Sequence, residues 1–347
     1  MKGKIEIHNG EFFDEWNSFV NDQSEARIEN LYEWKNILRD SYNLKSFYIY
    51  STGIEGNIEG ILPLFQISSV LFGRHLVSMP FLDYGGILSV DKNVSQKLHE
   101  YAANIAKDTG SHDLIYRHSQ KKISECSTYE NKVSFLMELD RSESVLWQRI
   151  GSERRNRIKK ANKLGLSVSY GKKSDLDVFY KIWSANMRDL GSPVHSKRFF
   201  NSILEYLPEN SGIILVRDVN DTVIASGLYL KYKETVSLPW VSSRKKFFHL
   251  YPNILLYWHL MADHGKVGYR LFDFGRSSIN SGTYHFKKRW KAKRFQLCWE
   301  IMSLNNKSTD FLNQDSESFA PMITCWKHTP VWITNIIGPY LRKNLIN

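Results

Sequence analysis

The chain has 347 residues, of which 42% are hydrophobic and 14% aromatic, so it can fill one or two packed cores and is not an intrinsically disordered sequence. No apolar run approaches the roughly 18 residues that a membrane-spanning helix needs, and the first residues lack the apolar segment of a secretory signal. The three cysteines are widely spaced and outside CxxC pairs, which fits free thiols better than a disulfide framework or a zinc site. These features predict a cytosolic protein without a metal.

The net charge is +11, and much of it is concentrated in one segment. Between Arg149 and Lys173, nine lysines and arginines are accompanied by one acid, Glu153, which gives +9 − 1 = +8. Such a focused positive field suits an anionic partner: a phosphate, a nucleic acid or an acidic lipid surface. A solvated helix face without a partner is the alternative.

The first half of the chain alternates helical and extended patterns. Apolar residues at helical spacing predict helices, and period-two runs predict strands. The stretch from Pro80 to Gly86 predicts a loop. The expected helices cover 11–20, 31–42 and 96–107, and the expected strands 46–50, 58–67, 114–117 and 133–139, with a strand-like segment over 69–78.

The second half repeats this order in outline without a sequence repeat. We therefore expect an α/β protein (layered as in α+β folds) with two similar lobes, each with a mixed, mostly antiparallel sheet flanked by helices. The lobes are expected over 1–140 and 141–303. The expected helices cover 145–163, 176–190, 196–206 and 252–264, and the expected strands 212–217, 223–232, 235–240, 269–274 and 295–300.

Residues 304–347 are expected to form a polar linker, over 305–318, and a C-terminal helical tail. The helix can gather its apolar side chains on one face, with two basic residues at its end. One interpretation is a helix that lies in a membrane interface, and the other is a helix that packs back onto a lobe. The apolar residues are Trp332, Ile336, Ile337, Tyr340 and Leu341, and the basic ones Arg342 and Lys343.

Four segments, in this order, resemble the FemAB-related proteins, and in particular the subgroup associated with exosortase/PEP-CTERM and exopolysaccharide gene clusters. The resemblance extends from about Trp16 to Trp299. It implies two GNAT-like lobes and, at the family level, aminoacyl or acyl transfer to an amine, as in peptidoglycan cross-bridge synthesis from aminoacyl-tRNA. The segments are LFGRHLVSMPFLDYGG (71–86), GSERRNRIKKA (151–161), MRDLGSPVHS (187–196), and FDFGRSS (272–278) with TYHFKKRW (283–290).

The basic segment is the first candidate for substrate binding. Its apolar positions, Ile150, Ile158, Ala161 and Leu164, can face the lobe and leave the arginines outward. Arginine side chains bind phosphate oxygens through two N–H groups at once, and several together hold a polyanion in a salt-dependent way. The expected phosphate-binding residues are Arg154, Arg155 and Arg157.

The resemblance also implies a role for the Phe286-Lys287 pair, because a Phe-Lys step lies at the catalytic channel of Fem transferases. Phe286 is then a substrate contact, and Lys287 stabilises the oxyanion of acyl transfer or holds the donor phosphate. The family pattern continues to Trp-Gly, whereas this chain has Trp290-Lys291. A surface lysine within a basic patch is the alternative for Lys287.

Two further residues are candidates for catalysis. Asp273 opens an expected turn over 273–278, where it can pair with Arg276 or with a substrate amine, or can serve as a structural turn carboxylate. His195 follows an expected helix end at Gly191 and has the pKa range of a general base. A structural histidine is the alternative, since acyl transfer on this fold can proceed with little acid–base help.

Two loops complete the candidate site. Asp83 and Tyr84 are expected to contact the acceptor, and the glycines at 85 and 86 allow a ligand to approach or form a tight turn. The stretch from Ser242 to Asn253, expected before a helix, contains no glycine, whereas acetyl-CoA enzymes hold pyrophosphate there with a Gly-rich loop. Arg244 can bind phosphate instead, but the missing cradle favours aminoacyl-tRNA or another activated acyl group over acetyl-CoA as the donor.

The leading hypothesis is an acyl- or aminoacyltransferase that acts on an amine of a cell-envelope or exopolysaccharide precursor. We expect an activated acyl donor as co-substrate, with tRNA as one carrier, no permanently bound cofactor, and contact with an anionic membrane at its inner face as one interpretation. The alternatives are a non-catalytic binder of an anionic partner and a CoA-dependent amino-sugar N-acyltransferase. The oligomeric state is not indicated.

Overall fold

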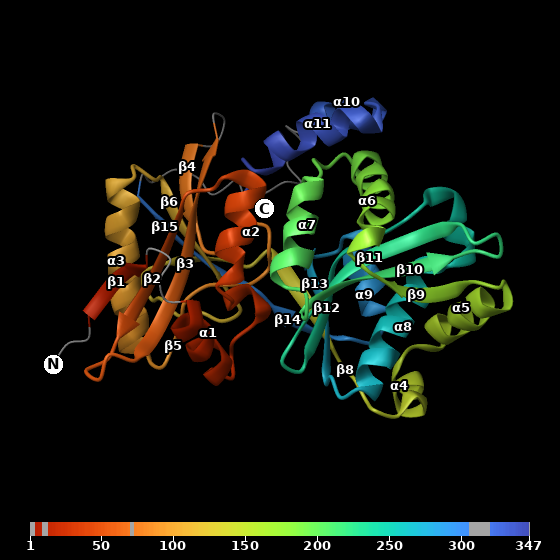
Figure 1. Ribbon diagram of the computed structural model, residues 1–347, viewed down its shortest axis with the longest axis horizontal. Helices are drawn as coiled ribbons and strands as arrows, with labels where there is room; N and C mark the ends of the chain where they lie inside the picture. Colours follow the sequence, from red (N-terminus) through yellow and green to blue (C-terminus); the bar gives the residue numbers. More distant parts are fainter. Residues whose placement is uncertain (1–3, 9–12, 70–72, 305–319, 347) are drawn as a thin grey trace. The chain divides into compact units, whose positions relative to one another are not determined.

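The computed structural model describes residues 4–8, 13–69, 73–304 and 320–346 (Figure 1). The chain divides into two compact units, and each is assembled from segments that are separated in sequence. The two lobes expected from the sequence are each one continuous stretch of chain, whereas each observed unit also includes a segment from near the C-terminus. The first unit contains Met1–Glu130, Leu297–Phe319 and Tyr340–Asn347, and the second contains Asn131–Gln296 and Ala320–Pro339.

The first unit is built on one mixed sheet. Its strands are β1 (Lys4–His8), β2 (Ser46–Thr52), β3 (Ile58–Ser69), β4 (Gly73–Val77), β5 (Leu88–Ser89), β6 (Asp113–His118), β7 (Ser127–Tyr129) and β15 (Cys298–Ser303). Their order is β1-β2-β3-β4-β6-β15-β7, with β5 beside β3. Only the β4–β6 pair is parallel among these described strands.

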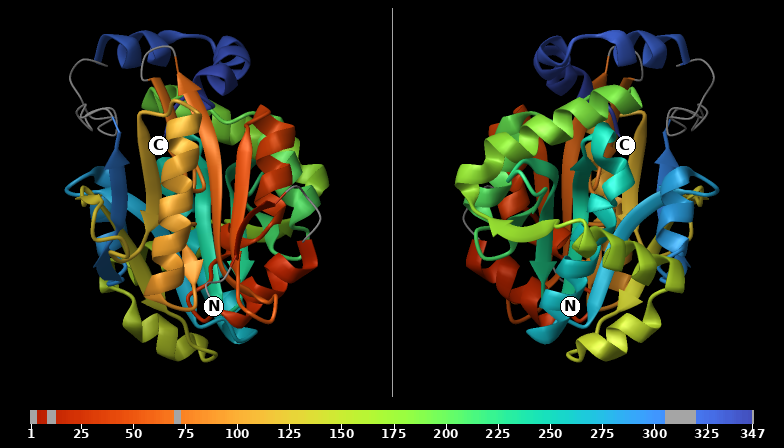
Figure 2. Two further views of the ribbon diagram at one scale, coloured as in Figure 1. Left: turned by 90° about the vertical axis from the view of Figure 1, so that its left-hand side faces the viewer. Right: turned by 90° about the vertical axis from the view of Figure 1, so that its right-hand side faces the viewer.

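Helices cover both faces of this sheet, because neighbouring strand residues point to opposite sides. On one face α3 packs on Ile49 and on the apolar residues of β3 and β6, and Figure 2 (left) shows α3 lying along the strands. On the other face Trp16 packs against Tyr48, and the fully buried Trp34 donates its indole N–H to the Ile28 carbonyl at 2.8 Å. The helices are α1 (Phe13–Asp22), a 3₁₀ turn (Ile28–Asn30), α2 (Glu33–Tyr42) and α3 (Lys92–Asp108).

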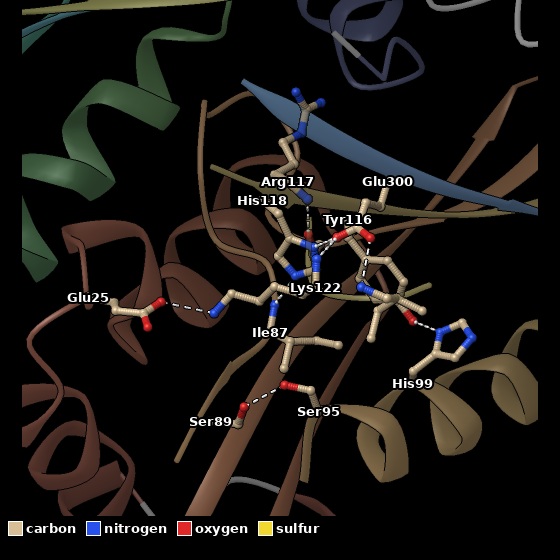
Figure 3. A network of polar contacts seen from close by, with 12 residues as sticks. Glu25, Ile87, Ser89, Ser95, His99, Tyr116, Arg117, His118, Lys122 and Glu300 are labelled. Atoms are coloured by element: carbon tan, nitrogen blue, oxygen red, sulfur yellow. Dashed lines mark hydrogen bonds and ion pairs between the residues drawn. The ribbon is translucent and has the colours of Figure 1, made fainter. Parts of the chain in front are cut away.

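A polar network lies buried within this unit, where β6 meets β15 (Figure 3). The His118 Nδ1 bonds to the Glu300 carboxylate, and its Nε2 accepts the backbone N–H of Ile87 at 2.8 Å. Glu300 also accepts the backbone N–H groups of Lys122 at 2.9 Å and Ile123 at 2.8 Å. Both nitrogens of the imidazole are therefore used, and the ring is held as the neutral tautomer that carries its proton on Nδ1.

The second unit has its own mixed sheet. Its strands are β8 (Lys132–Glu138), β9 (Ser167–Gly171), β10 (Ser211–Arg217), β11 (Val223–Tyr232), β12 (Thr235–Ser243), β13 (Leu271–Ser278) and β14 (Lys293–Gln296). Their order is β14-β8-β13-β12-β11-β10-β9. The β12–β13 pair is parallel, and the other described pairs are antiparallel.

Two layers of helices enclose this sheet, with α6 and α7 on one face and α8 on the other, where α4 and α5 pack against α8 (Figure 1). The core around α8 includes Trp258, Phe272 and Trp290. The helices are α4 (Glu143–Arg149), α5 (Ser152–Lys163), α6 (Leu176–Leu190), α7 (Lys197–Tyr206), α8 (Pro252–Lys266), α9 (Gly282–Lys288) and α10 (Ala320–His328), with 3₁₀ turns at Lys173–Asp175 and Lys245–Leu250. The helix α11 (Val331–Arg342) belongs to this unit as far as Pro339.

Three sequence predictions need correction. The helix expected over 145–163 is two helices, because Ile150 and Gly151 are extended (ψ 153° and 148°) and interrupt it. The strand expected over 295–300 is β14 and β15, which belong to different sheets. The expected turn at 273–278 is the end of β13, where the pairing with β8 shifts between Asp273 and Arg276 and Gly275 adopts φ +70°.

The tail contains α10 and α11. The Gly191 backbone lies against Ile323 of α10, and Arg188 donates to the Thr329 carbonyl at 3.0 Å. No helix in the described parts of the chain is long and apolar enough to cross a bilayer. The linker expected over 305–318 lies outside the described residues.

Candidate functional site

The strands β12 and β13 separate soon after they pair. Their parallel pairing covers only three residues of each strand, Thr235–Ser237 opposite Leu271–Asp273. Beyond that point β12 continues to Ser243 and β13 to Ser278. The sheet is therefore splayed at the carboxyl ends of these two strands, which is where ligands approach open α/β sheets.

A cavity of about 530 Å³ opens beside the carboxyl end of β12. It is bounded by residues from α5, from the end of β12 and the start of α8, and from α9. Three arginines and one histidine are among them, and no acidic residue is. The lining residues are Arg154, Arg157, Ser243, Phe248, Tyr251, Pro252, Asn253, Ile254, Gly282, His285, Phe286 and Arg289.

Arg154 lines this cavity from a position that is 1% exposed, which corrects the expectation that it faces outward. One guanidinium nitrogen donates to the Phe286 carbonyl at 3.1 Å, and the group lies 4.8 Å from the Phe286 ring and 5.5 Å from the Trp290 ring. Burial lowers the pKa of Arg154 to about 10, so the side chain is charged at neutral pH. Its Nε has no hydrogen-bond partner in the part of the chain that the structure describes. A buried cation with donor capacity to spare at a cavity wall can receive an anion.

Arg157 and Arg289 place further positive charge at the cavity and are more exposed. Arg157 bonds to Glu153 at 2.5 Å, and its guanidinium lies 5.2 Å from the Tyr251 ring. Arg289 approaches the same carboxylate at 3.8 Å. Both arginines are thus held by one acid while they line the cavity.

The amino end of α8 faces the cavity through Pro252, Asn253 and Ile254. Proline at the first helical position leaves no N–H unpaired there, and Asn253 accepts the Ser243 hydroxyl at 2.5 Å. The positive end of a 15-residue helix adds to the field of the arginines. This arrangement has the chemistry of a phosphate site in which side chains take the place of a Gly-rich backbone cradle.

Phe286 lines this cavity, and its ring packs 5.3 Å from the Tyr257 ring. Lys287 points elsewhere. It is 7% exposed, and its Nζ donates to the carbonyls of Gly275 at 2.8 Å and Arg276 at 2.7 Å. These contacts join α9 to the irregular segment of β13, so the side chain is buried rather than part of an exposed basic patch.

Asp273 and Arg276 belong to the same irregular segment. The buried Asp273 carboxylate accepts the Ser134 hydroxyl at 2.9 Å and the Gly275 backbone N–H at 2.7 Å. Arg276 supplies one of the carbonyls that Lys287 binds. Asp273 and Lys287 thus hold Gly275 from both of its backbone groups, which fixes the path of β13 toward α9.

His195 lies in a different part of the unit. It is 3% exposed and stacks on Phe199 with ring centroids 4.5 Å apart. Phe200 and Trp240 extend this aromatic cluster. The residue does not line the cavity described above.

Asp83 and Tyr84 lie in the first unit. The Trp299 indole N–H donates to the Asp83 carbonyl at 3.4 Å, and the Arg27 guanidinium lies 3.9 Å from the Tyr84 ring. A Cβ at Gly86 would overlap the His118 ring. The glycine pair is therefore needed for packing against neighbouring side chains.

Two expected phosphate-binding residues have other contacts. Arg155 donates to the carbonyls of Trp147 at 3.3 Å and Ile150 at 2.6 Å, so it caps the end of α4. The backbone N–H of Arg244 donates to the Ile224 carbonyl at 2.9 Å, and its half-buried side chain does not line the cavity. Leu164, expected to face the lobe, is 39% exposed.

The sequence prediction missed His285, Arg289 and Tyr251 as lining residues. The signal was present for the first two, because both stand beside the Phe286-Lys287 pair in a basic run. Tyr251, directly before Pro252, adopts a left-handed backbone conformation (φ 60°). Residues other than glycine seldom adopt this conformation, so the sequence did not indicate it.

Residues 152–288 match a protein family described as an acetyltransferase (GNAT) domain. No match is found among curated proteins. The structure is similar to that of FemX, with a TM-score of 0.67 at 14% identity, covering 86% of this chain and 98% of FemX. It is also similar to the C-terminal domain of a predicted lysylphosphatidylglycerol synthetase from Agrobacterium fabrum (TM-score 0.57, 11% identity, 95% and 97% covered).

A tandem GNAT protein from the clavulanic acid biosynthesis pathway is similar as well, with a TM-score of 0.51 at 8% identity, covering 88% of this chain and 100% of that protein. At such identities the similarity establishes the fold. The chain consists of two GNAT-type α/β units in tandem, which confirms the fold class expected from the sequence.

Proposed function

We propose that the protein is a transferase that moves an activated acyl or aminoacyl group from a phosphate-bearing donor to an amine. The observation that carries this proposal is the cavity beside the splayed strands β12 and β13, where Arg154, Arg157 and Arg289 meet the amino end of α8. The GNAT match over 152–288 covers the residues that form most of this cavity.

The arginines bind the donor phosphate, and the apolar wall that includes Phe286 and Tyr251 receives the part of the donor next to it. The acceptor nitrogen attacks the acyl carbonyl carbon, and the C–N bond forms as the bond to the carrier sulfur or oxygen breaks. The proton lost from nitrogen passes to the leaving group through His285 or water. Positioning supplies most of the acceleration in such a reaction.

Lys287 and Asp273 act in this proposal as positioning residues rather than as catalytic ones. Their side chains bind the backbone around Gly275, and α9 carries Phe286 and His285 to the cavity. His285 is the better placed candidate for receiving the proton, since His195 lies in the aromatic cluster beside Phe199. Asp83 and Tyr84 stay predicted acceptor contacts.

The structure and the similarities favour particular chemical classes for the donor and the acceptor. The loop before α8 is a 3₁₀ turn without glycine, which favours aminoacyl-tRNA over acyl-CoA, because the backbone pyrophosphate cradle is replaced by side chains. The similarity to FemX and to a predicted lysylphosphatidylglycerol synthetase supports an amine of a cell-envelope component as the acceptor. The resemblance to the subgroup associated with exopolysaccharide gene clusters favours a polysaccharide precursor.

The test is donor binding and transfer by the full chain with acetyl-CoA and with an aminoacyl-tRNA pool, at low and high salt. We expect the melting temperature to rise with one donor class and the rise to shrink in Arg289→Ala and Arg157→Ala. Arg270→Ala is the matched control, because Arg270 is an exposed arginine that pairs with Glu234 and does not line the cavity. No response to either donor would contradict the proposal and favour the non-catalytic binder; a response to acetyl-CoA alone would favour the CoA-dependent N-acyltransferase.

A further inference from the structure

The C-terminal helix α11 packs by its small residues and exposes its large apolar ones. Thr334 is 1% exposed and Gly338, one turn later, is also buried. A Cβ at Gly338 would lie 3.0 Å from the Val194 side chain and 3.1 Å from the Val194 backbone, so glycine permits this close contact. The helix therefore has a fixed face and a free face.

The free face carries a row of large apolar and aromatic side chains. Trp332, Ile336 and Tyr340 stand four residues apart and are 66%, 59% and 65% exposed, and Ile337 and Leu341 beside them are 44% and 38% exposed. Residues four apart lie on one face of a helix. A soluble domain normally buries such a row, so its exposure marks an interaction surface.

The chemistry of the segment identifies the partner. Over residues 320–346 the chain has Lys327, Arg342 and Lys343 and not one aspartate or glutamate. Tryptophan and tyrosine are the side chains that prefer the boundary between hydrocarbon and water, and basic residues beside them attract anionic head groups.

We propose that α11 is an interfacial membrane helix, which seats its row of Trp332, Ile336 and Tyr340 in the surface of an anionic bilayer. The helix lies along the surface, since no helix in the described parts of the chain can span a bilayer. The proposal goes beyond the transfer reaction and does not depend on it, because it uses none of the residues of the cavity. Membrane contact would bring the protein to acceptors that are attached to lipid.

The test is flotation of the full chain with vesicles of phosphatidylcholine alone and of phosphatidylcholine mixed with phosphatidylglycerol. We expect binding to the anionic vesicles, weaker binding to the neutral ones, and release by salt. The double variant Trp332→Ser with Ile336→Ser should lower partitioning about ten-fold or more, because it removes two of the side chains that insert. Lys343→Gln should reduce the preference for anionic vesicles.

Val267→Ser is the matched control, since Val267 is an apolar residue that is 75% exposed at the end of α8. It should bind vesicles like the unaltered protein, as should Arg289→Ala, which tests the proposed function instead. Circular dichroism shows whether the double variant is folded. Absence of vesicle binding, or equal binding by a folded double variant, would overturn the proposal. So would a dimer in light scattering that the double variant abolishes, because it would assign the face to a second copy of the chain.

Discussion

Two buried charged groups, the His118–Glu300 pair of the first unit and Arg154 of the second, are bonded in different ways. In the first unit the His118–Glu300 pair is closed: both imidazole nitrogens are bonded, and the carboxylate accepts three hydrogen bonds (Figure 3). In the second unit Arg154 is equally buried, yet its Nε has no partner among the described residues and the side chain borders a cavity. A satisfied network supports structure, whereas a buried cation that can still donate a hydrogen bond is what the proposed anion site requires.

The largest effect is expected from Glu300→Ala. The change leaves the His118 Nδ1–H and the backbone N–H groups of Lys122 and Ile123 buried without an acceptor, so it should lower the free energy of unfolding by about 3–5 kcal/mol. Urea denaturation measures this. Glu300→Gln keeps one carbonyl acceptor and should lose less; equal stability of Glu300→Ala and the unaltered protein would show that the network does not support the fold.

Acid should destabilise the same region. Burial lowers the pKa of His118 and of His99 below the ordinary 6.5, and although burial alone would raise the pKa of Glu300, the hydrogen bonds that it accepts lower it below 4.5. As the pH falls below 6.5, the histidines of the unfolded chain are therefore protonated before those of the folded chain. The free energy of unfolding should decrease until the pH has passed the lower pKa values of the folded state. Each unit of pKa difference corresponds to about 1.4 kcal/mol.

Urea denaturation between pH 7 and pH 5 tests this expectation. Burial also lowers the pKa of His264 in the second unit. The pH dependence of the unaltered protein therefore contains contributions from both units. His118→Gln isolates one of them: its stability should vary less steeply with pH. An identical slope would assign the pH dependence to other groups.

Arg154→Met should separate binding from stability. The side chain has one hydrogen bond and two aromatic contacts, and its replacement has similar length and no desolvation cost, so the free energy of unfolding should change by less than about 2 kcal/mol. Pyrophosphate binding, measured by calorimetry, should weaken about ten-fold or more. Unchanged binding with a large loss of stability would make Arg154 a structural residue and remove the contrast between the units.

Arg155→Met is the control from the neighbouring position and has the smallest expected effect. Arg155 caps the carbonyls at the end of α4, so its loss should lower the melting temperature by a few degrees, corresponding to about 1 kcal/mol. Pyrophosphate binding should stay the same within about two-fold. A larger loss of binding would mean that the whole basic segment, and not the buried arginine, attracts the anion.

Much of the fold could be predicted from the sequence, because hydrophobic periodicity is local. The predicted ranges of α6 and β11 agree with the structure at both ends, and most other elements agree within a few residues. The break between α4 and α5 was missed, since Ile150 and Gly151 follow a helical apolar pattern and only their backbone shows the interruption. The exchange of strands depends on pairing between distant segments, which a single sequence does not reveal.

The candidate site was predicted in part. The positive charge of α5 and the position of Phe286 could be read from residue type and resemblance. Residue type alone does not reveal that Arg154 is buried while Arg155 caps a helix, because both look like exposed positions of a basic helix. The lysine at 287 was expected to face substrate, and its bonds to two backbone carbonyls arise from the irregular strand that only the folded chain shows.

The adjacent strands β14 and β15 enter different sheets, with the buried Leu297 alone between them. On the ribosome, β6 is made long before its partner β15, and the two pair over residues that are about 180 positions apart in the chain. Until then one edge of β6 is open, and open strand edges promote aggregation. The first unit can therefore be completed only after β15 (Cys298–Ser303) has been translated, so a fragment that stops at residue 140 should be insoluble without a chaperone.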